Sequence, residues 1–181
     1  MRYFIIVLII LICSCKKLDE FSPRQFRIYT IEEGRHKSES LPSIKLNSKY
    51  IEFEALFNSS CIYNIGQDQS DINKLYGFSN GTNHLENSAR FGWRWYNNEL
   101  QILAYTHIDS KIQWKYITTI DYNKIYSYKL SITNNNYVFT CNNTTVELPA
   151  SGKGVIRYYL FPYFGGNKTA PHKITITIKE K

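Results

Sequence analysis

Arg90, Arg94, Tyr105 and His107 are the side chains whose types and spacing best fit a binding site in this sequence. The two arginines, and likewise Tyr105 and His107, are separated by an even number of positions, so in extended strands each pair projects from one face. Guanidinium groups bind carboxylates through paired hydrogen bonds, and flat rings pack against the apolar face of a sugar. This combination predicts a glycan-binding surface on which the arginines favour acidic sugars.

Asn83 and His84 lie in the polar segment that precedes these strands, and we expect them to extend the same surface. If the surface belonged to an enzyme, Tyr105 and His107 would act as acid and base in β-elimination from a uronic acid, with an arginine neutralising the carboxylate. The alternative is that all these side chains pair with neighbouring strands and simply solvate a sheet.

The segment 88–109 must position these residues, and its pattern predicts a β-hairpin. Phe91, Trp93 and Trp95 alternate with the arginines, so three large rings lie on the opposite face. Two adjacent asparagines at 97–98 tolerate the left-handed conformations of a tight turn, and the return strand alternates as well. We expect the ringed face to be buried in a core and the other face to be open to solvent.

Short alternating segments recur along the rest of the chain, with Asn, Gly and Pro turn signals between them. The predicted strands outside the hairpin are 26–31, 50–57, 61–65, 111–120, 124–133, 137–141, 144–148, 155–164 and 173–179. Only 67–75 suggests a helical turn, with Ser70 or Asp71 as its N-cap. The pattern predicts an all-β fold, either a two-sheet antiparallel β-sandwich or a barrel.

The composition fits one β-rich domain. A chain of 181 residues with 43% apolar content, 15 Tyr and 10 Phe supplies a proper core for one domain and is too short for two good-sized ones. The formal net charge of +7 comes from scattered Lys and Arg, with no run longer than Lys16-Lys17. We therefore interpret the charge as a solvated basic surface and expect no nucleic-acid partner.

The N-terminus predicts export and lipidation. Arg2 gives a positive start, an apolar run follows over 4–12, and small residues end it at Cys15. The run is too short to cross a bilayer core of about 30 Å, so 1–14 is predicted to be a signal peptide. The ending resembles the lipobox of bacterial lipoproteins, whose final cysteine, here Cys15, is lipidated and inserts into the membrane. An ordinary secreted protein is the alternative.

Residues 15–25 are polar and are predicted to form a tether to a single β-sandwich domain over 26–181. The start of the tether, KKLDE at 16–20, resembles the export signal of surface lipoproteins. We therefore predict a lipid-anchored protein of the bacterial outer membrane, on the cell surface rather than on the periplasmic face.

Cys61 and Cys141 are the cysteines that lie in the predicted domain. In an oxidising compartment a disulfide between them is one of two alternatives, and in the chain-entropy model it would contribute on the order of 4 kcal/mol to the free energy of unfolding. Each also fits the alternative of a small, buried apolar residue.

No metal-binding spacing links the histidines at 36, 84, 107 and 172, and no CxxC pair is present, so we expect no metal-dependent chemistry and no cofactor. Structural calcium stays open, because β-sandwiches often bind it. Acidic residues are sparse, however, and no Asp-rich calcium loop is present.

Three segments, DINKLYGFSNG at 71–81, NSARFGWRWYNNELQILAY at 87–105 and LFPYFGGNKTAPHKITITI at 160–178, resemble bacterial surface lipoproteins with a concanavalin A-like jelly roll. That group is related in shape to lectins, glucanases and alginate lyases. The resemblance covers about residues 45–180 and implies two curved antiparallel sheets, of which the concave one commonly receives a carbohydrate. The chain lacks the glutamate pair of the glucanases and the Gln-Ile-His and Tyr-Phe-Lys motifs of the alginate lyases.

The combined prediction is a lipid-anchored β-sandwich of the jelly-roll type that binds a carbohydrate on its concave sheet without catalysis. One alternative is a polysaccharide lyase or glycoside hydrolase on the same scaffold. The other is a structural or host-interaction lipoprotein. A groove lined by the predicted residues would favour the first two, and two titratable groups within reach of a bound uronic acid would separate enzyme from binder.

Overall fold

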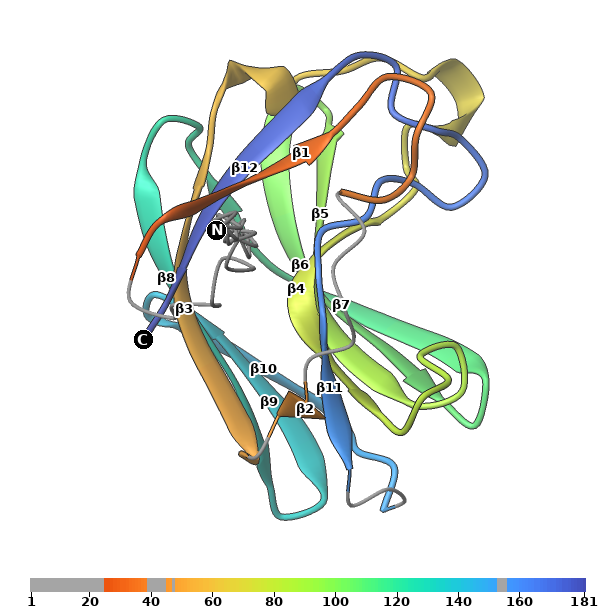
Figure 1. The fold of residues 1–181 in the computed structure, drawn as a ribbon, viewed down its shortest axis with the longest axis vertical. Coiled ribbons are helices and arrows are strands. Elements are labelled where there is room, and N and C mark those ends of the chain that lie inside the picture. Colours follow the sequence, from red (N-terminus) through yellow and green to blue (C-terminus); the bar gives the residue numbers. More distant parts are fainter. Residues whose placement is uncertain (1–24, 39–44, 47, 153–155) are drawn as a thin grey trace, which may run out of the picture.

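Strands of alternating burial form two antiparallel sheets that pack face to face (Figure 1). The computed structural model describes residues 25–38, 45–46, 48–152 and 156–181. Sheet A contains, in spatial order, β1 (Arg27–Ile31), β12 (Ile174–Glu180), β3 (Tyr50–Phe57), β8 (Ile125–Thr133), β9 (Asn136–Cys141) and β10 (Thr144–Pro149). Sheet B contains β2 (Lys45–Leu46), β11 (Arg157–Leu160), β4 (Asn73–Asn80), β5 (Ser88–Tyr96), β6 (Glu99–Ile108) and β7 (Lys111–Ile120). The predicted two-sheet antiparallel β-sandwich is confirmed.

Large rings from facing strands fill the space between the sheets. Phe91 and Trp93 on β5 are fully buried, as their alternation predicts, and Trp95 is half-buried at the rim of the core. Phe91 meets Phe53 of β3 and Tyr128 of β8 edge to face, with ring centroids 5.7 and 5.1 Å apart. Each such pair contributes about 0.5–1.5 kcal/mol beyond the burial of its area. These contacts join β5 to both central strands of sheet A.

Tight asparagine turns connect the hairpins. Asn97 and Asn98, between β5 and β6, have φ angles of 53° and 60°. Asn134 and Asn135, between β8 and β9, have φ angles of 49° and 58°, and Asn142 after β9 has 49°. Asparagine tolerates this left-handed region because its short side chain can hydrogen-bond locally. The predicted turns at these three places are confirmed.

Two predicted elements between β3 and β5 are wrong. In place of the predicted strand 61–65, Cys61 ends a 3-10 helix, η1 (Ser59–Cys61), and 62–65 have no regular secondary structure. The cap residue Asn58 accepts a hydrogen bond from the N–H of Ser60 at 2.9 Å. The predicted helical turn 67–75 is limited to η2 (Gly66–Asp68), and β4 begins soon after it. All the residues of β4 are buried, so its sequence lacks the alternation by which a half-exposed strand is recognised.

The predicted strand 155–164 is also shorter than expected. Its described strand, β11, ends at Leu160, and Pro162 follows. Proline has no N–H to donate to a neighbouring strand, so ladder pairing stops before it. Beyond it, Tyr163 forms isolated bridges with Lys37 and Lys74.

Cys61 and Cys141 are free thiols in the structure, so the disulfide that the sequence left open is not formed. Both side chains are buried in the main hydrophobic core. Burial raises the pKa of Cys61 to about 12 and that of Cys141 to about 11, which keeps both protonated at neutral pH. The structure therefore agrees with the alternative stated from the sequence, in which each cysteine is a small, buried apolar residue.

The predicted signal peptide 1–14, the lipidation site Cys15 and the tether up to residue 24 lie outside the described residues. Within the described ranges, no helix has the length and apolar character needed to span a membrane.

Glu180 is a buried carboxyl that links the two sheets. It ends β12 of sheet A and accepts a hydrogen bond from the hydroxyl of Tyr76 on β4 of sheet B. Burial raises the pKa of Glu180 to about 7. A raised carboxyl pKa means that the folded protein holds this proton more tightly than the unfolded chain does.

We expect Glu180→Gln to stabilise the protein above neutral pH and to have little effect in acid. The folded carboxyl stays protonated up to about pH 7, whereas an unfolded glutamate ionises near its ordinary value of about 4.3. Its contribution to the free energy of unfolding is therefore full below about pH 4 and is lost as the pH rises through about 7. Glutamine keeps a neutral acceptor, so the gain should reach roughly 3 kcal/mol, measured by urea unfolding on both sides of this range.

Glu32→Gln is the matched control, because the Glu32 carboxylate is 61% exposed beside Lys173. Its effect on the free energy of unfolding should stay small on both sides of this range, because an exposed ion pair contributes little. If Glu180→Gln gave the same difference in acid and above neutral pH, the assignment of a buried, protonated Glu180 would be contradicted.

Candidate functional site

The outer face of sheet B carries a row of side chains that crosses four strands. Arg90 of β5 pairs in register with Gly77 of β4 and with Tyr105 of β6, and Tyr105 pairs with Trp114 of β7. His107 lies two residues along β6 from Tyr105 and therefore shares this face. The predicted hairpin thus brings Arg90, Tyr105 and His107 together.

A β-bulge in β4 adds a second cation to this face. The register between β4 and β5 shifts between Lys74 and Gly77, and the two residues between them, Leu75 and Tyr76, both lie in the core. Lys74 and Gly77 consequently both face outward. Strict alternation would turn one of these two positions into the core.

Glycine at position 77 leaves space for the Arg90 side chain. A Cβ atom on Gly77 would stand 2.1 Å from the carbonyl oxygen of Ala89 and 2.9 Å from Cγ of Arg90. No other residue fits at such distances. Because the closest atoms, including Cα of Arg90 at 2.6 Å, belong to the backbone of β5, glycine at 77 allows β4 and β5 to approach this closely and also leaves room for the Arg90 side chain.

The segment after β11 covers one side of this face. The backbone of Tyr163 exchanges hydrogen bonds with that of Lys74, with N···O distances of 2.9 and 2.8 Å. The ammonium of Lys74 donates to the carbonyl oxygen of Gly165 at 3.1 Å. The imidazole of His36 stacks on the ring of Tyr163, with centroids 5.2 Å apart. Lys74 is therefore held between sheet B and this segment.

Arg90, Tyr105 and His107 are nearly fully buried, so the prediction that this face is open to solvent is wrong at its centre. Their exposed fractions are 5%, 6% and 6%, and that of Lys74 is 8%. The Lys74 ammonium lies 4.7 Å from the ring centroid of Tyr105, which meets the His107 ring edge to face at 5.4 Å. Lys74 and Tyr163 come from segments outside the hairpin and cover what the hairpin alone would expose.

The two buried cations have no carboxylate partner in the part of the chain that the structure describes. None of the ion pairs there includes Arg90 or Lys74, and Nε of Arg90 is buried without a hydrogen-bond partner. Asp71 is close enough to raise the pKa of Lys74, but its carboxylate accepts the N–H of Asn167 at 3.2 Å. Buried charge without a partner is costly, so this face is electrostatically incomplete.

Burial lowers the proton affinity of the basic groups on this face. Burial first, and then the charge of Arg90, lower the pKa of Lys74 to about 8 and that of His107 to about 4. Burial lowers the pKa of Arg90 to about 10, although the hydroxyls of Tyr105 and Tyr163 act in the opposite direction. At neutral pH, His107 is therefore a neutral imidazole, whereas Arg90 and most of the Lys74 population are charged.

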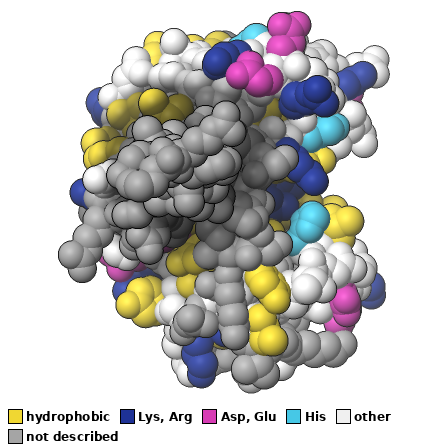
Figure 2. All heavy atoms as spheres, viewed as in Figure 1, with side chains coloured by type: hydrophobic (Ala, Val, Ile, Leu, Met, Phe, Trp, Pro, Cys, Tyr) yellow, Lys and Arg dark blue, Asp and Glu magenta, His cyan; other side chains and the backbone are white. Residues whose placement is uncertain are grey.

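Of the two loop residues predicted to join this face, His84 lies near the cations and Asn83 makes a local turn. Burial first, and then the charge of Arg90, lower the pKa of His84. Asn83 is exposed, and its carboxamide oxygen accepts the N–H of Leu85 at 3.1 Å. We use the term cationic cluster for Lys74, His84, Arg90, Tyr105, His107 and Tyr163. Figure 2 shows Lys, Arg and His side chains gathered at the right of the molecule.

An open aromatic flank lies beside the cationic cluster. Ile112, Trp114 and Tyr116 alternate along β7 and are 57%, 50% and 48% exposed. A cavity of about 350 Å³ has Trp114, Lys74 and Asp71 in its walls. Exposed rings next to charged donors give this part of the face both flat apolar contact and polar contact.

Arg94 is engaged by its neighbours. Its Nε donates to Oε1 of Gln101 at 2.9 Å, and an Nη donates to the carbonyl oxygen of Ser70 at 2.8 Å. Its guanidinium also lies 4.6 Å from the ring centroid of Tyr96 and 5.6 Å from that of Trp114. The alternative of pairing within the sheet therefore describes Arg94, which still lines the cavity.

Reasoning from the sequence missed Lys74, Tyr163 and Trp114 as members of this face. Lys74 fell in the segment 67–75, predicted as a helical turn, and Tyr163 fell in a predicted continuous strand. The available signal for Lys74 was a lone cation directly before the run Leu75–Phe78, which carries no charged side chain. Trp114 fell in the predicted strand 111–120, whose pattern does not show that its ring is exposed.

The described ranges contain no group of three or more His, Cys, Asp or Glu side chains that could hold a metal ion. His36 and His172 hydrogen-bond to the carbonyl oxygens of Phe164 and Ser60, both at 2.9 Å.

No known protein family and no curated protein sequence matches the chain. Solved structures match it in fold. Alginate lyase AlyC3 aligns with 85% of this chain and 73% of its own, at 9% identity and a TM-score of 0.61. LamAcat from Zobellia galactanivorans aligns with 84% of this chain and 74% of its own, at 11% identity and a TM-score of 0.54. The polysaccharide lyase family 18 protein aly-SJ02 aligns with 91% of this chain and 90% of its own, at 7% identity and a TM-score of 0.50.

At sequence identities this low, the structural alignments show a shared architecture and nothing more specific. The resemblance predicted from the sequence is confirmed for the fold: the chain is a two-sheet jelly roll of the concanavalin A-like type, an architecture that it shares with polysaccharide lyases.

Proposed function

We propose that the protein binds an acidic carbohydrate through the cationic cluster. The observation that carries this proposal is the pair of buried cations, Arg90 and Lys74, which have no carboxylate partner among the described residues. The carboxylate of an acidic sugar would accept charge-assisted hydrogen bonds from these groups and supply the missing negative charge.

The surroundings of the two cations fit a sugar ring. Trp114 and Tyr116 expose flat faces that can cover the apolar C–H side of a pyranose. The adjacent cavity of about 350 Å³ lies within the range of small-molecule sites. The fold comparison supports the same ligand class, because a structure of alginate lyase AlyC3 in complex with dimannuronate aligns with a TM-score of 0.59.

A second candidate function is β-elimination from a uronate, and the neutral imidazole of His107 beside Tyr105 favours it. His107 would take the proton from C5, and that electron pair would form the C4–C5 double bond. The C4–O bond would break while the Tyr105 hydroxyl protonates the leaving oxygen. Arg90 would stabilise the charge that develops on the carboxylate.

Glycoside hydrolysis has less support on this face. Hydrolases usually place two carboxyl groups across the scissile bond. Among the described residues that line the cavity, Asp71 is the one carboxylate, and the backbone of Asn167 already binds it.

From the sequence we also propose that the domain is anchored by lipid at Cys15 after removal of 1–14. The positive start, the short apolar run and the small residues before Cys15 support this. The tether that follows supports placement at the surface of the outer membrane. There the sandwich would meet extracellular glycans.

Lys74→Met is expected to weaken binding of a mannuronate oligomer by about tenfold to a hundredfold, because one charge-assisted hydrogen bond is lost. The midpoint of thermal unfolding should rise, because the substitution removes a buried cation that repels Arg90 and keeps a side chain of similar length. Isothermal titration calorimetry and thermal denaturation measure the two effects on the same samples.

Lys129→Met is the matched control, because it removes an exposed positive charge on β8 of sheet A, beside Glu52. It should leave the affinity unchanged. Arg90→Lys, which keeps the charge and loses the paired donors, should weaken binding as well. Equal losses in Lys74→Met and Lys129→Met would indicate a general charge effect and contradict the proposed site.

Elimination creates an unsaturated uronate that absorbs ultraviolet light, so it can be followed directly during incubation with the mannuronate oligomer. If the protein is a lyase, His107→Ala should abolish the rise in absorbance because the base is lost, while Lys129→Met should retain it. Tight binding without any rise in absorbance would assign the face to binding alone.

Cys15→Ala should abolish incorporation of labelled palmitate when the full chain is expressed in a Gram-negative host, because the acceptor thiol is lost. The control is Cys13→Ala, which should remain labelled. Unchanged labelling of Cys15→Ala would contradict the proposed anchor.

A further inference from the structure

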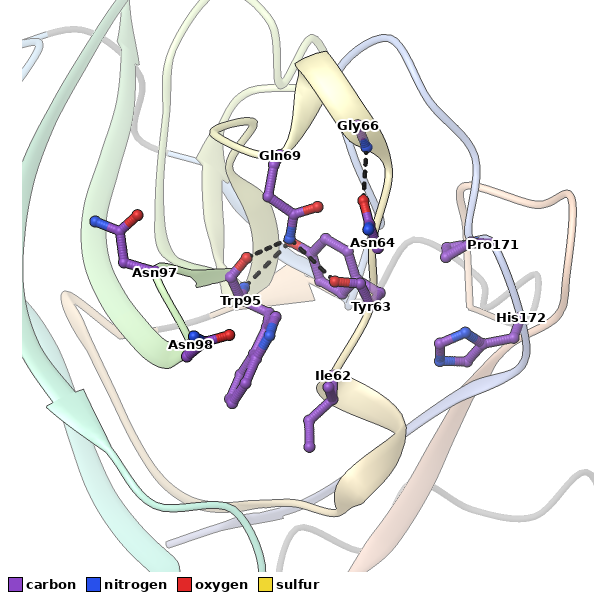
Figure 3. Close-up of a pocket in the computed structure, with 10 residues that line it drawn as sticks. All are labelled: Ile62, Tyr63, Asn64, Gly66, Gln69, Trp95, Asn97, Asn98, Pro171 and His172. Carbon is purple, nitrogen blue, oxygen red and sulfur yellow. Dashed lines mark hydrogen bonds between the residues drawn. The ribbon is translucent and has the colours of Figure 1, made fainter.

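We propose that a second pocket, beside the β5–β6 turn, binds an uncharged sugar unit. This pocket, which we call the turn pocket, has a volume of about 610 Å³. Figure 3 shows Trp95 and Asn98 on one side, His172 and Pro171 on the facing side, and Ile62 between them. It shares no lining residue with the cavity next to the cationic cluster.

The described residues that line the turn pocket include no Lys, Arg, Asp or Glu side chain. They carry instead four carboxamides and three rings, supplied by Asn64, Gln69, Asn97, Asn98, Tyr63, Trp95 and His172. Carboxamides both donate and accept hydrogen bonds, as sugar hydroxyls do. The absence of formal charge in this lining disfavours an ionic ligand and distinguishes the turn pocket from the cationic cluster.

Hydrogen bonds fix the upper wall of the turn pocket (Figure 3). Oε1 of Gln69 accepts the N–H of Ile65 at 2.9 Å, and Nε2 of Gln69 donates to the carbonyl oxygens of Tyr63 and Trp95 at 3.1 and 2.5 Å. Oδ1 of Asn64 accepts the N–H of Gly66 at 2.9 Å. A wall that is already ordered loses little side-chain entropy when a ligand binds.

Trp95 supplies the apolar surface. The backbone N–H of Trp95 donates to the hydroxyl of Tyr63 at 3.2 Å, and its backbone carbonyl oxygen accepts from Gln69, so the backbone is held on both sides. The side chain is half-buried and packs against the core from the rim. An indole fixed at the mouth of a neutral pocket provides a flat face for the C–H side of a pyranose.

Asn97, Asn98 and His172 supply the polar groups that remain available. Both asparagine side chains are exposed, and neither forms a hydrogen bond with another described residue. Nε2 of His172 donates to the carbonyl oxygen of Ser60 at 2.9 Å, which leaves Nδ1 as an acceptor. Two amides and one imidazole nitrogen around an indole can bind several hydroxyls of one ring.

The probes are neutral hexasaccharides of mannose, of β-1,3-linked glucose and of β-1,4-linked glucose, titrated into the full chain in a detergent without a sugar headgroup. At least one of them should bind with a dissociation constant below millimolar and shift the indole N–H resonance of Trp95. The double variant Asn97→Gly/Asn98→Gly should weaken this binding about tenfold or more. Glycine keeps the left-handed turn, so this variant removes the carboxamides and retains the hairpin.

A second variant, Trp95→Leu, tests the stacking surface independently and should also weaken binding about tenfold or more. The matched control is Trp114→Leu, which removes an exposed indole from the flank of the cationic cluster and should leave neutral-sugar binding unchanged. Lys74→Met should likewise have no effect on it. The turn-pocket variants should bind mannuronate as the wild type does, so the proposal for the turn pocket and the proposal for the cationic cluster are tested independently.

Two results would overturn the proposal. One is the absence of binding of all three neutral hexasaccharides to the full chain at millimolar concentration. The other is binding that survives in both turn-pocket variants or is lost in Trp114→Leu.

Discussion

The edge-to-face contacts of Phe91 with Phe53 and Tyr128 determine which side chains of β5 point into the core and which point outward from sheet B. Successive side chains in a strand point to opposite faces, so burial of Phe91 and Trp93 forces Arg90 outward. A slip by one residue would place the guanidinium in the core and the rings outside, at a cost that no contact on the outer face could offset. The aromatic core therefore fixes the register of the cationic cluster.

The cationic cluster itself depends on departures from a regular sheet. The bulge in β4 turns Lys74 to the same side as Arg90, and the bridges of Tyr163 close the face over both. Together these departures bury Lys74 and Arg90 without a carboxylate partner among the described residues. The turn pocket is built differently: the amides of Gln69 and Asn64 are tied to backbone groups, those of Asn97 and Asn98 remain available, and none of them carries a charge.

The sequence was sufficient for the hairpin 88–109, the asparagine turns and the sandwich, because period-two burial is a local pattern. It was insufficient for β4, whose two faces are both covered, so that no alternation remains to be seen. For the same reason, the sequence did not predict that Lys74 lies in a strand and faces outward. Burial of Arg90 could not be foreseen either, because Lys74 and Tyr163 reach it only through pairing between distant segments. Arg94 shows the converse: its position was predicted, and of the two roles left open for it, pairing with its neighbours is the one that the structure shows.

Gly77 and Arg90 form a linked pair whose consequence is evolutionary. Any Cβ at position 77 collides with the backbone of β5 and with the arginine side chain itself. The two closest contacts are with backbone atoms of β5, so they remain whatever side chain stands at position 90, and glycine should persist at 77 even in a descendant that has lost the arginine. Among divergent jelly rolls, retention of both residues at paired positions of adjacent strands would mark the lineages that still keep a cation over this sheet.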